Sequence, residues 1–134
     1  MAKPLYDAGL DRQRLSHLLE ELSDIVRAFC GHDPILRGNF EVLRRRCGKT
    51  PCRCLTGQPH VSRVLVDRTS GKRRFCKATP ELRRRVRKPL QAYRRLRVLR
   101  MRFGKLQREF LDACDRLRDA RIAEGAHLVS RLTE

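Results

Sequence analysis

The sequence has no tryptophan, few aromatic residues and no long run of apolar residues. Aromatic side chains make up only 5% of the 134 residues, so a core must be built mainly from leucine, valine and phenylalanine. No apolar stretch reaches the roughly 20 residues that a helix needs to cross a bilayer. The N-terminal Met-Ala-Lys-Pro-Leu-Tyr-Asp segment also lacks the apolar centre of a signal peptide. We therefore expect a single cytoplasmic domain spanning residues 1–134.

Acidic residues are scarce relative to basic ones. The chain has 15 Asp and Glu against 32 Lys and Arg, which gives a formal net charge of +17. Residues 37–78 and 79–121 each carry a net charge of +10, whereas residues 1–36 and 122–134 are slightly negative. Arginine supplies 26 of the basic residues, and its planar guanidinium suits bidentate contacts with phosphate. The charge therefore favours a polyanionic partner.

The sequence also lacks the patterns that usually carry catalysis. No Ser-His-Asp set, paired carboxylates or phosphate-binding glycine loop stands out. Pro51-Cys52-Arg53-Cys54 does not have the Pro-Cys-x-x-Cys spacing of zinc deaminases, and no His-x-Glu accompanies it. The apolar residues of the C-terminal half form only a narrow seam, which argues against a membrane-surface role. We expect neither enzymatic activity nor a small-molecule substrate.

Cysteine, in contrast, is concentrated in one short segment. Cys47, Cys52, Cys54 and His60 fall within the stretch Cys-Gly-Lys-Thr-Pro-Cys-Arg-Cys-Leu-Thr-Gly-Gln-Pro-His. Three thiolates and an imidazole are the ligands that a closed structural Zn²⁺ site takes, and a reducing cytoplasm favours metal binding over disulfides. Buried structural thiols and a redox or disulfide role are the alternatives. Cys76 is an alternative to His60 as the fourth ligand.

The hydrophobic periodicity predicts a mainly α fold with a small β insert. Apolar residues spaced by three and four predict a helix over 11–30, with Asp11 as its N-cap and Gly31 after its end. Short apolar runs and a Ser-Gly-Lys turn predict a zinc-knuckle and β-hairpin unit over 35–78. Thr79 is a suitable N-cap for a long basic helix over 79–123 that continues through Pro89 and stops at Gly125.

A heptad pattern in the long helix predicts coiled-coil-like packing against the first helix as a hairpin. The first helix is about half as long as the second, so we expect it to leave half of the seam exposed. That exposed seam predicts a homodimer or a complex with a larger protein. The two seam positions are occupied by Leu96, Phe103, Phe110 and Leu117, and by Leu99, Leu106, Ala113 and Ala120.

The basic runs predict nucleic-acid binding. A solvated helix face would usually interleave acids with its bases, yet no acid lies between Arg83 and Arg108. No recognition-helix pattern is present, so we expect backbone contacts, which position a protein but do not specify a sequence. DNA is favoured and RNA is possible. The candidate contacts are Arg44, Arg45, Arg46, Lys49, Arg53, Lys72, Arg73, Arg74, Arg83, Arg84, Arg87, Arg94 and Arg97.

The segment from Pro34 to about Phe110 resembles an uncharacterised family of small bacterial proteins associated with mobile elements. The resemblance depends on Arg37-Gly38-Asn39, Arg45-Arg46-Cys47-Gly48-Lys49, Pro51-Cys52-Arg53-Cys54, Gly71-Lys72 and Pro80-Glu81-Leu82. The family's Gly-Pro-Tyr after the histidine is replaced here by Val61-Ser62-Arg63. The resemblance implies a bacterial source and a mobile-element context, and it implies no activity.

Together these observations predict a zinc-stabilised DNA-binding accessory protein that acts with a larger partner such as a transposase or recombinase. The alternative is an assembly subunit that binds RNA, or docks on an enzyme, through its exposed helical seam.

Overall fold

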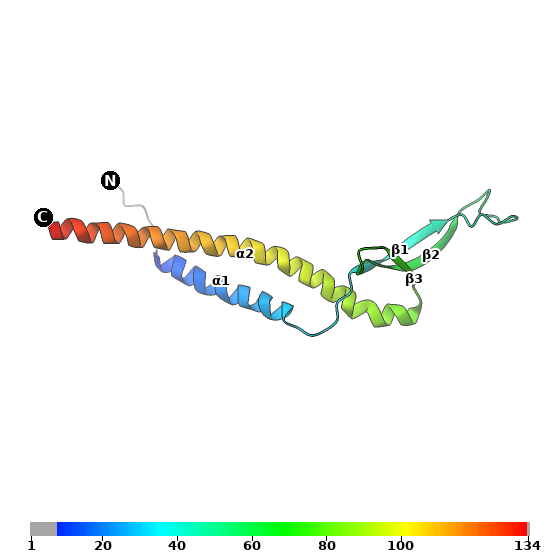
Figure 1. The fold of residues 1–134 in the computed structure, drawn as a ribbon, viewed down its shortest axis with the longest axis horizontal. Coiled ribbons are helices and arrows are strands. Elements are labelled where there is room, and N and C mark those ends of the chain that lie inside the picture. Colours follow the sequence, from blue (N-terminus) through cyan, green and yellow to red (C-terminus); the bar gives the residue numbers. More distant parts are fainter. Residues whose placement is uncertain (1–7, 134) are drawn as a thin grey trace. The chain divides into compact units, whose positions relative to one another are not determined.

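A computed structural model describes residues 8–133 of the chain. Its elements follow the order α1 (Ala8–Phe29), β1 (Gly38–Arg45), β2 (His60–Asp67), β3 (Arg74–Lys77) and α2 (Pro80–Thr133). The fold is mainly helical with one three-stranded antiparallel sheet, as the sequence predicts (Figure 1). The described chain forms two compact units, residues 8–31 with 96–133 and residues 32–95. No helix among the described residues has the length and apolarity that a bilayer-spanning segment requires.

In the first unit, α1 packs beside the 96–133 part of α2 (Figure 1). The packing is antiparallel, because contacts further along α1 meet residues earlier in α2. Leu18 and Ile25 are buried together with Leu106, and Leu22, Leu99, Phe103 and Phe110 pack around them. The predicted helical hairpin and its heptad seam are therefore confirmed.

Ion pairs flank this core along the hairpin. Asp11 pairs with Arg116 at 2.7 Å, and Arg14 pairs with Glu109 at 2.5 Å. Glu21 accepts a hydrogen bond from Arg102. Asp11 lies within α1, whose described residues begin at Ala8. The expectation that Asp11 caps the helix is therefore wrong. The pairing with α2 and the favourable position of an acid in the first turn explain its place there.

The seam is covered more completely than the sequence predicts. Leu106 and Ala113 are buried, and the other six seam residues from Leu96 to Ala120 are partly buried. The expectation of a half-exposed seam is therefore wrong. The reason is that the first 16 residues of α2 belong to the sheet unit and carry none of the seam. The 22 residues of α1 are nearly as long as the seam, which runs from Leu96 to Ala120.

The end of α2 also differs from the prediction. The helix continues through Gly125 to Thr133 instead of stopping near Ala123. A glycine costs a helix only about 1 kcal/mol relative to alanine, and no proline follows it to prevent continuation. The start of α2 is as predicted, since Thr79 accepts a hydrogen bond from the Leu82 N–H through its hydroxyl at 3.2 Å. The helix also continues through Pro89.

The second unit holds the sheet, in the order β1-β2-β3. Val64, Leu65 and Val66 of β2 are all buried. Since consecutive strand residues point to opposite faces, the sheet is covered on both faces at this point. The Leu36 N–H donates to the Pro89 carbonyl at 3.1 Å, which ties the chain before β1 to the start of α2.

Gly38 sits at a tight contact between β1 and β2. A Cβ atom at this position would lie 2.4 Å from the Val66 carbonyl oxygen. Only glycine allows the two strands to approach this closely at the start of their pairing.

Candidate metal centre and basic ribbon

The candidate site lies at the end of a two-stranded ribbon. All of β1 pairs with all of β2, from Gly38 opposite Asp67 to Arg45 opposite His60. The third strand pairs only with residues 64–67 of β2. Residues 42–45 and 60–63 therefore extend beyond β3 as an antiparallel pair, and residues 60–63 are exposed (Figure 1).

The loop from residue 46 to residue 59 closes the end of this ribbon. Gly48 has a φ of 70°, a backbone conformation that glycine adopts without strain. The Leu55 N–H donates to the Cys52 carbonyl at 3.1 Å, and the Gly57 N–H donates to the Arg53 carbonyl at 2.9 Å. These two bonds form a compact turn that carries two of the cysteines. The peptide bond between Thr50 and Pro51 is cis.

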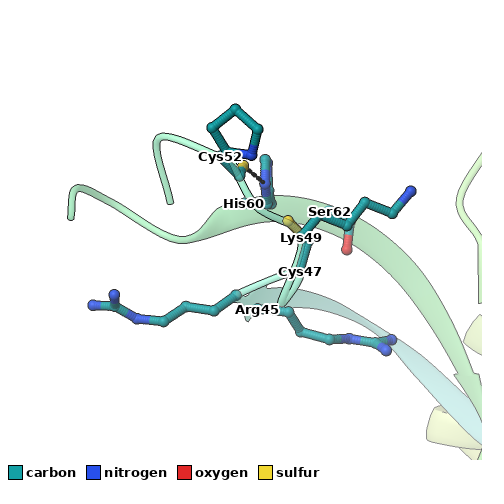
Figure 2. Close-up of a pocket in the computed structure, with 8 residues that line it drawn as sticks. Arg45, Cys47, Lys49, Cys52, His60 and Ser62 are labelled. Carbon is teal, nitrogen blue, oxygen red and sulfur yellow. Dashed lines mark hydrogen bonds between the residues drawn. The ribbon is translucent and has the colours of Figure 1, made fainter. Parts of the chain in front are cut away.

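Cys47, Cys52, Cys54 and His60 converge within this structure. One ligand atom from each lies within 4.8 Å of the others. The Sγ atoms of Cys47 and Cys54 are 3.5 Å apart, and Cys52 Sγ lies 3.2 Å from His60 Nε2 (Figure 2). Tetrahedral zinc with bonds of about 2.0–2.3 Å separates its ligand atoms by roughly 3.3–3.8 Å. The four residues that the sequence singled out can therefore hold one metal ion.

His60, and not Cys76, completes the cluster. His60 begins β2, whereas Cys76 pairs with Leu65, five residues further along that strand. At about 3.3 Å per residue, this separation is roughly 16 Å. Cys76 is therefore too distant to join the other three cysteines, and it packs in the sheet unit.

The backbone of the knuckle favours a thiolate at Cys54. Its side chain has no solvent exposure, and the Cys47 N–H donates to its Sγ at 3.5 Å. That backbone hydrogen bond is the main cause that lowers the pKa of Cys54 below its ordinary value, and the charge of Arg46 adds to it. A hydrogen bond from the Cys54 backbone lowers the pKa of Cys52, but the neighbouring thiols and burial raise it overall. Cys54 thus loses its proton more readily than Cys52.

Arg46 supports the cluster from outside. Its guanidinium donates to the carbonyl oxygens of Cys54 and Leu55 at 2.9 and 2.8 Å. The sequence predicted a nucleic-acid contact here and missed this clamp, which only the folded loop reveals. Arg45, Lys49 and Ser62 line an open pocket beside Cys52 and His60 (Figure 2).

The remaining basic residues of the ribbon are exposed. No acid lies between Glu41 and Asp67, while six arginines and lysines do. Arg44, Arg45, Lys49, Arg53 and Arg63 are all exposed and make no ion pair within residues 8–133. Lys72, Arg73 and Arg74 are exposed at the start of β3.

The residues of α2 that were predicted to contact nucleic acid differ in their burial. Arg83 is partly buried, with its guanidinium 5.3 Å from the centre of the Phe40 ring. This cation–π contact gives Arg83 a role in joining α2 to the sheet. Arg84, Arg87, Arg94 and Arg97 are exposed and form no ion pair with any described residue.

Comparisons of the chain with protein-family models, with curated proteins and with solved structures found no match.

Proposed function

We propose that this protein is a zinc-stabilised nucleic-acid-binding protein whose β1–β2 ribbon contacts duplex DNA. The proposal rests on a candidate metal cluster and a basic ribbon that occur together at one end of the sheet. A metal-competent Cys₃His cluster fixes the end of a ribbon that carries exposed arginines and has no acid between Glu41 and Asp67.

Zinc is the metal that best fits the four ligands. Thiolates select soft or borderline cations, and imidazole suits zinc, whereas Ca²⁺ and Mg²⁺ require oxygen ligands. The four side chains fill a tetrahedral shell, so the ion has a structural role. Three thiolates and a neutral histidine around Zn²⁺ leave a net charge of about −1. The exposed basic side chains nearby offset this charge.

Phosphate is the group that fits the basic side chains that form no ion pair. Arg44, Arg45, Lys49 and Arg53 repel one another on the free ribbon, and a phosphate backbone would relieve that repulsion. The exposed arginines of α2, including Arg84, Arg87, Arg94 and Arg97, extend the basic character to a second element. About six phosphate contacts would give a slope near −5 for log affinity against log salt concentration.

The test is fluorescence anisotropy of a labelled 20-base-pair duplex with the zinc-loaded full chain. We expect Arg45→Ala combined with Lys49→Ala to weaken binding and to reduce the salt slope by about two. The matched control combines Arg121→Ala with Arg131→Ala, which removes the same charge from the far part of α2. Wild-type binding that is absent, or independent of salt, would contradict the proposal.

We further propose that the protein acts as an accessory to a larger enzyme, such as a transposase or recombinase. The resemblance to mobile-element-associated proteins supports this role. Tagged protein recovered from its own cells after nuclease treatment should retain one larger chain. Recovery of that chain only while DNA is intact would mean that the two meet on DNA and do not dock.

An exposed stripe on α1 supports self-association through a different surface from the seam. Leu19, Val26 and Phe29 lie on one side of α1 and are about half exposed. Their spacing makes the apolar face of α1 wider than α2 covers. The acidic and basic residues of α1 nearly balance, so a second copy can approach it without strong repulsion. We propose a homodimer through this stripe, which Leu19→Lys with Val26→Lys should convert to monomer in sedimentation equilibrium at unchanged helical content.

A further inference from the structure

The ribbon has two chemically different faces beyond β3. Residues directly opposite in an antiparallel pair share a face, as do residues two apart on one strand. Val42 pairs with Arg63, and Arg44 pairs with Val61, so these four side chains share one face. Leu43, Arg45, His60 and Ser62 occupy the other face by the same rule.

The metal cluster occupies only the second face. His60 is in contact with Cys52 there, and Arg45 and Ser62 line the pocket beside them (Figure 2). The first face is open, since the exposed fractions of Val42 and Val61 are 53% and 58%. Arg44 and Arg63 on the same face are also exposed. Two exposed valines on a strand pair are ordinary in themselves. What distinguishes this face is that the two valines alternate with two exposed arginines, so that it offers both methyl and guanidinium groups.

From this arrangement we infer that Val42, Arg44, Val61 and Arg63 form a base-reading face that enters the major groove of duplex DNA. The inference rests on the proposed DNA-binding function and adds an element, a groove and a sequence preference to it. The major groove is about 12 Å wide and admits a two-stranded β-ribbon, whereas the minor groove is about 6 Å wide and must be opened by deforming the duplex before a ribbon enters it. The deep, narrow major groove of duplex RNA excludes the ribbon as well.

The side chains on this face match the groups that base pairs present in the major groove. Arginine makes bidentate hydrogen bonds to O6 and N7 of guanine, and aliphatic side chains contact the methyl group of thymine. The two residue pairs of this face lie two residues apart along each strand, a separation of roughly 7 Å at about 3.3 Å per residue. This separation corresponds to about two base-pair steps at about 3.4 Å per pair. The face therefore reads a site of about three base pairs that contains guanine and thymine.

The role of the metal follows from the same geometry. The ion holds the two strands together from the opposite face and leaves the reading face free of ligands. The exposed basic residues of the knuckle, Lys49 and Arg53, lie beyond the end of the strands in the closing loop. They contact the phosphates at the groove edge, which sets the depth of the ribbon.

The test uses a pool of 30-base-pair duplexes with ten randomised central pairs and the zinc-loaded full chain. Bound and input DNA are sequenced, and total binding to the pool is measured in parallel. We expect enrichment of a short guanine- and thymine-containing site by the wild type. Arg44→Lys with Arg63→Lys keeps the charge but loses the bidentate fork. It should retain total binding within about twofold and lose about tenfold in preference per arginine.

A matched control changes two arginines outside the reading face. Arg121→Lys with Arg131→Lys should keep both total binding and the wild-type preference. Replacing the guanines of the enriched site with 7-deazaguanine, which lacks the N7 acceptor, should reduce the wild-type affinity to that of the pool.

The two proposals fail in different ways. Strong binding to the pool without enrichment of any sequence, or undiminished enrichment by the Arg44→Lys and Arg63→Lys variant, would overturn the reading face and leave DNA binding intact. Absence of binding to the pool at any salt concentration would overturn the proposed function and the reading face with it.

Discussion

Removal of the metal should open the end of the ribbon while the helical hairpin stays folded. Residues 42–45 and 60–63 have no third strand beside them, and an isolated two-stranded ribbon is marginally stable at best in water. An ion bound by the candidate cluster would join Cys47 and His60 across a loop that starts and ends at the ribbon. The core around Leu18 and Leu106 contains no ligand and does not depend on the metal.

The size of the effect follows from the length of the closed loop. A cross-link around about 15 residues lowers the free energy of the closed form by about 3 kcal/mol through chain entropy. Loss of 3 kcal/mol corresponds to a factor of roughly 150 in the closed-to-open ratio at 1.4 kcal/mol per tenfold change. This amount is enough to open a marginal ribbon but is less than the total stability of a domain, which is about 5–15 kcal/mol.

Amide hydrogen exchange with and without a zinc chelator measures this directly. The cross-strand amides of residues 42–45 and 60–63, together with those of Leu55 and Gly57, should lose about 100-fold or more in protection. Amides of α1 near Leu18 should change little. Unchanged protection of the ribbon after complete zinc removal would refute the reasoning, because the strands would then be stable without the ion.

Three further changes test other contacts. Arg46→Ala removes the two hydrogen bonds to carbonyls of the knuckle and should lower zinc affinity by about tenfold in a competition titration, as loss of outer-shell support does. Leu18→Ala should lower the free energy of unfolding by about 2–5 kcal/mol, because Leu18 is fully buried. Met101→Ala, at an exposed position on α2, should change it by no more than about 0.5 kcal/mol. The hydrogen bond from Arg102 lowers the pKa of Glu21 below its ordinary value. The stability that this contact contributes is present above the unfolded pKa and is lost as pH falls through the lowered folded pKa. Arg102→Ala should return the Glu21 pKa toward its ordinary value in an NMR titration.

Each of these changes has an outcome that would count against it. Lys49→Ala removes a nearby charge without touching the carbonyls, so an equal loss of zinc affinity in that variant would assign the Arg46 effect to charge alone. Equal losses of stability from the Leu18 and Met101 variants would contradict the buried seam. A Glu21 titration that Arg102→Ala leaves unchanged would remove the ion pair from the account of the hairpin.

Strong local patterns made most of the fold predictable. Leu18, Ile25 and the heptad from Leu96 repeat with helical spacing, so both helices and their pairing follow from the sequence. The β unit within residues 35–78 was also predicted, because turn residues separate its short apolar runs. Gly125 misled the prediction, since the cost of one glycine is smaller than the gain from continuing a long helix.

The ligands of the metal site were predictable because soft ligand types cluster in sequence. The contacts that support these ligands were not predictable. The clamp from Arg46 to the carbonyls of Cys54 and Leu55 depends on how the closing loop folds back, which residue types do not encode. The choice of His60 over Cys76 depends on strand register, because one residue begins β2 and the other lies opposite its buried half. The alternation of valine and arginine near Val42 and Val61 was the available signal for the open face.

X-ray absorption at the zinc edge, combined with elemental analysis of the same purified sample, tests the central claim most directly. The account predicts one zinc per chain, with three sulfur neighbours at about 2.3 Å and one nitrogen neighbour at about 2.0 Å. Cys54→Ser should reduce the sulfur count and weaken retention of the ion. Protein that folds its ribbon with no bound metal, or zinc surrounded only by oxygen and nitrogen, would contradict the account.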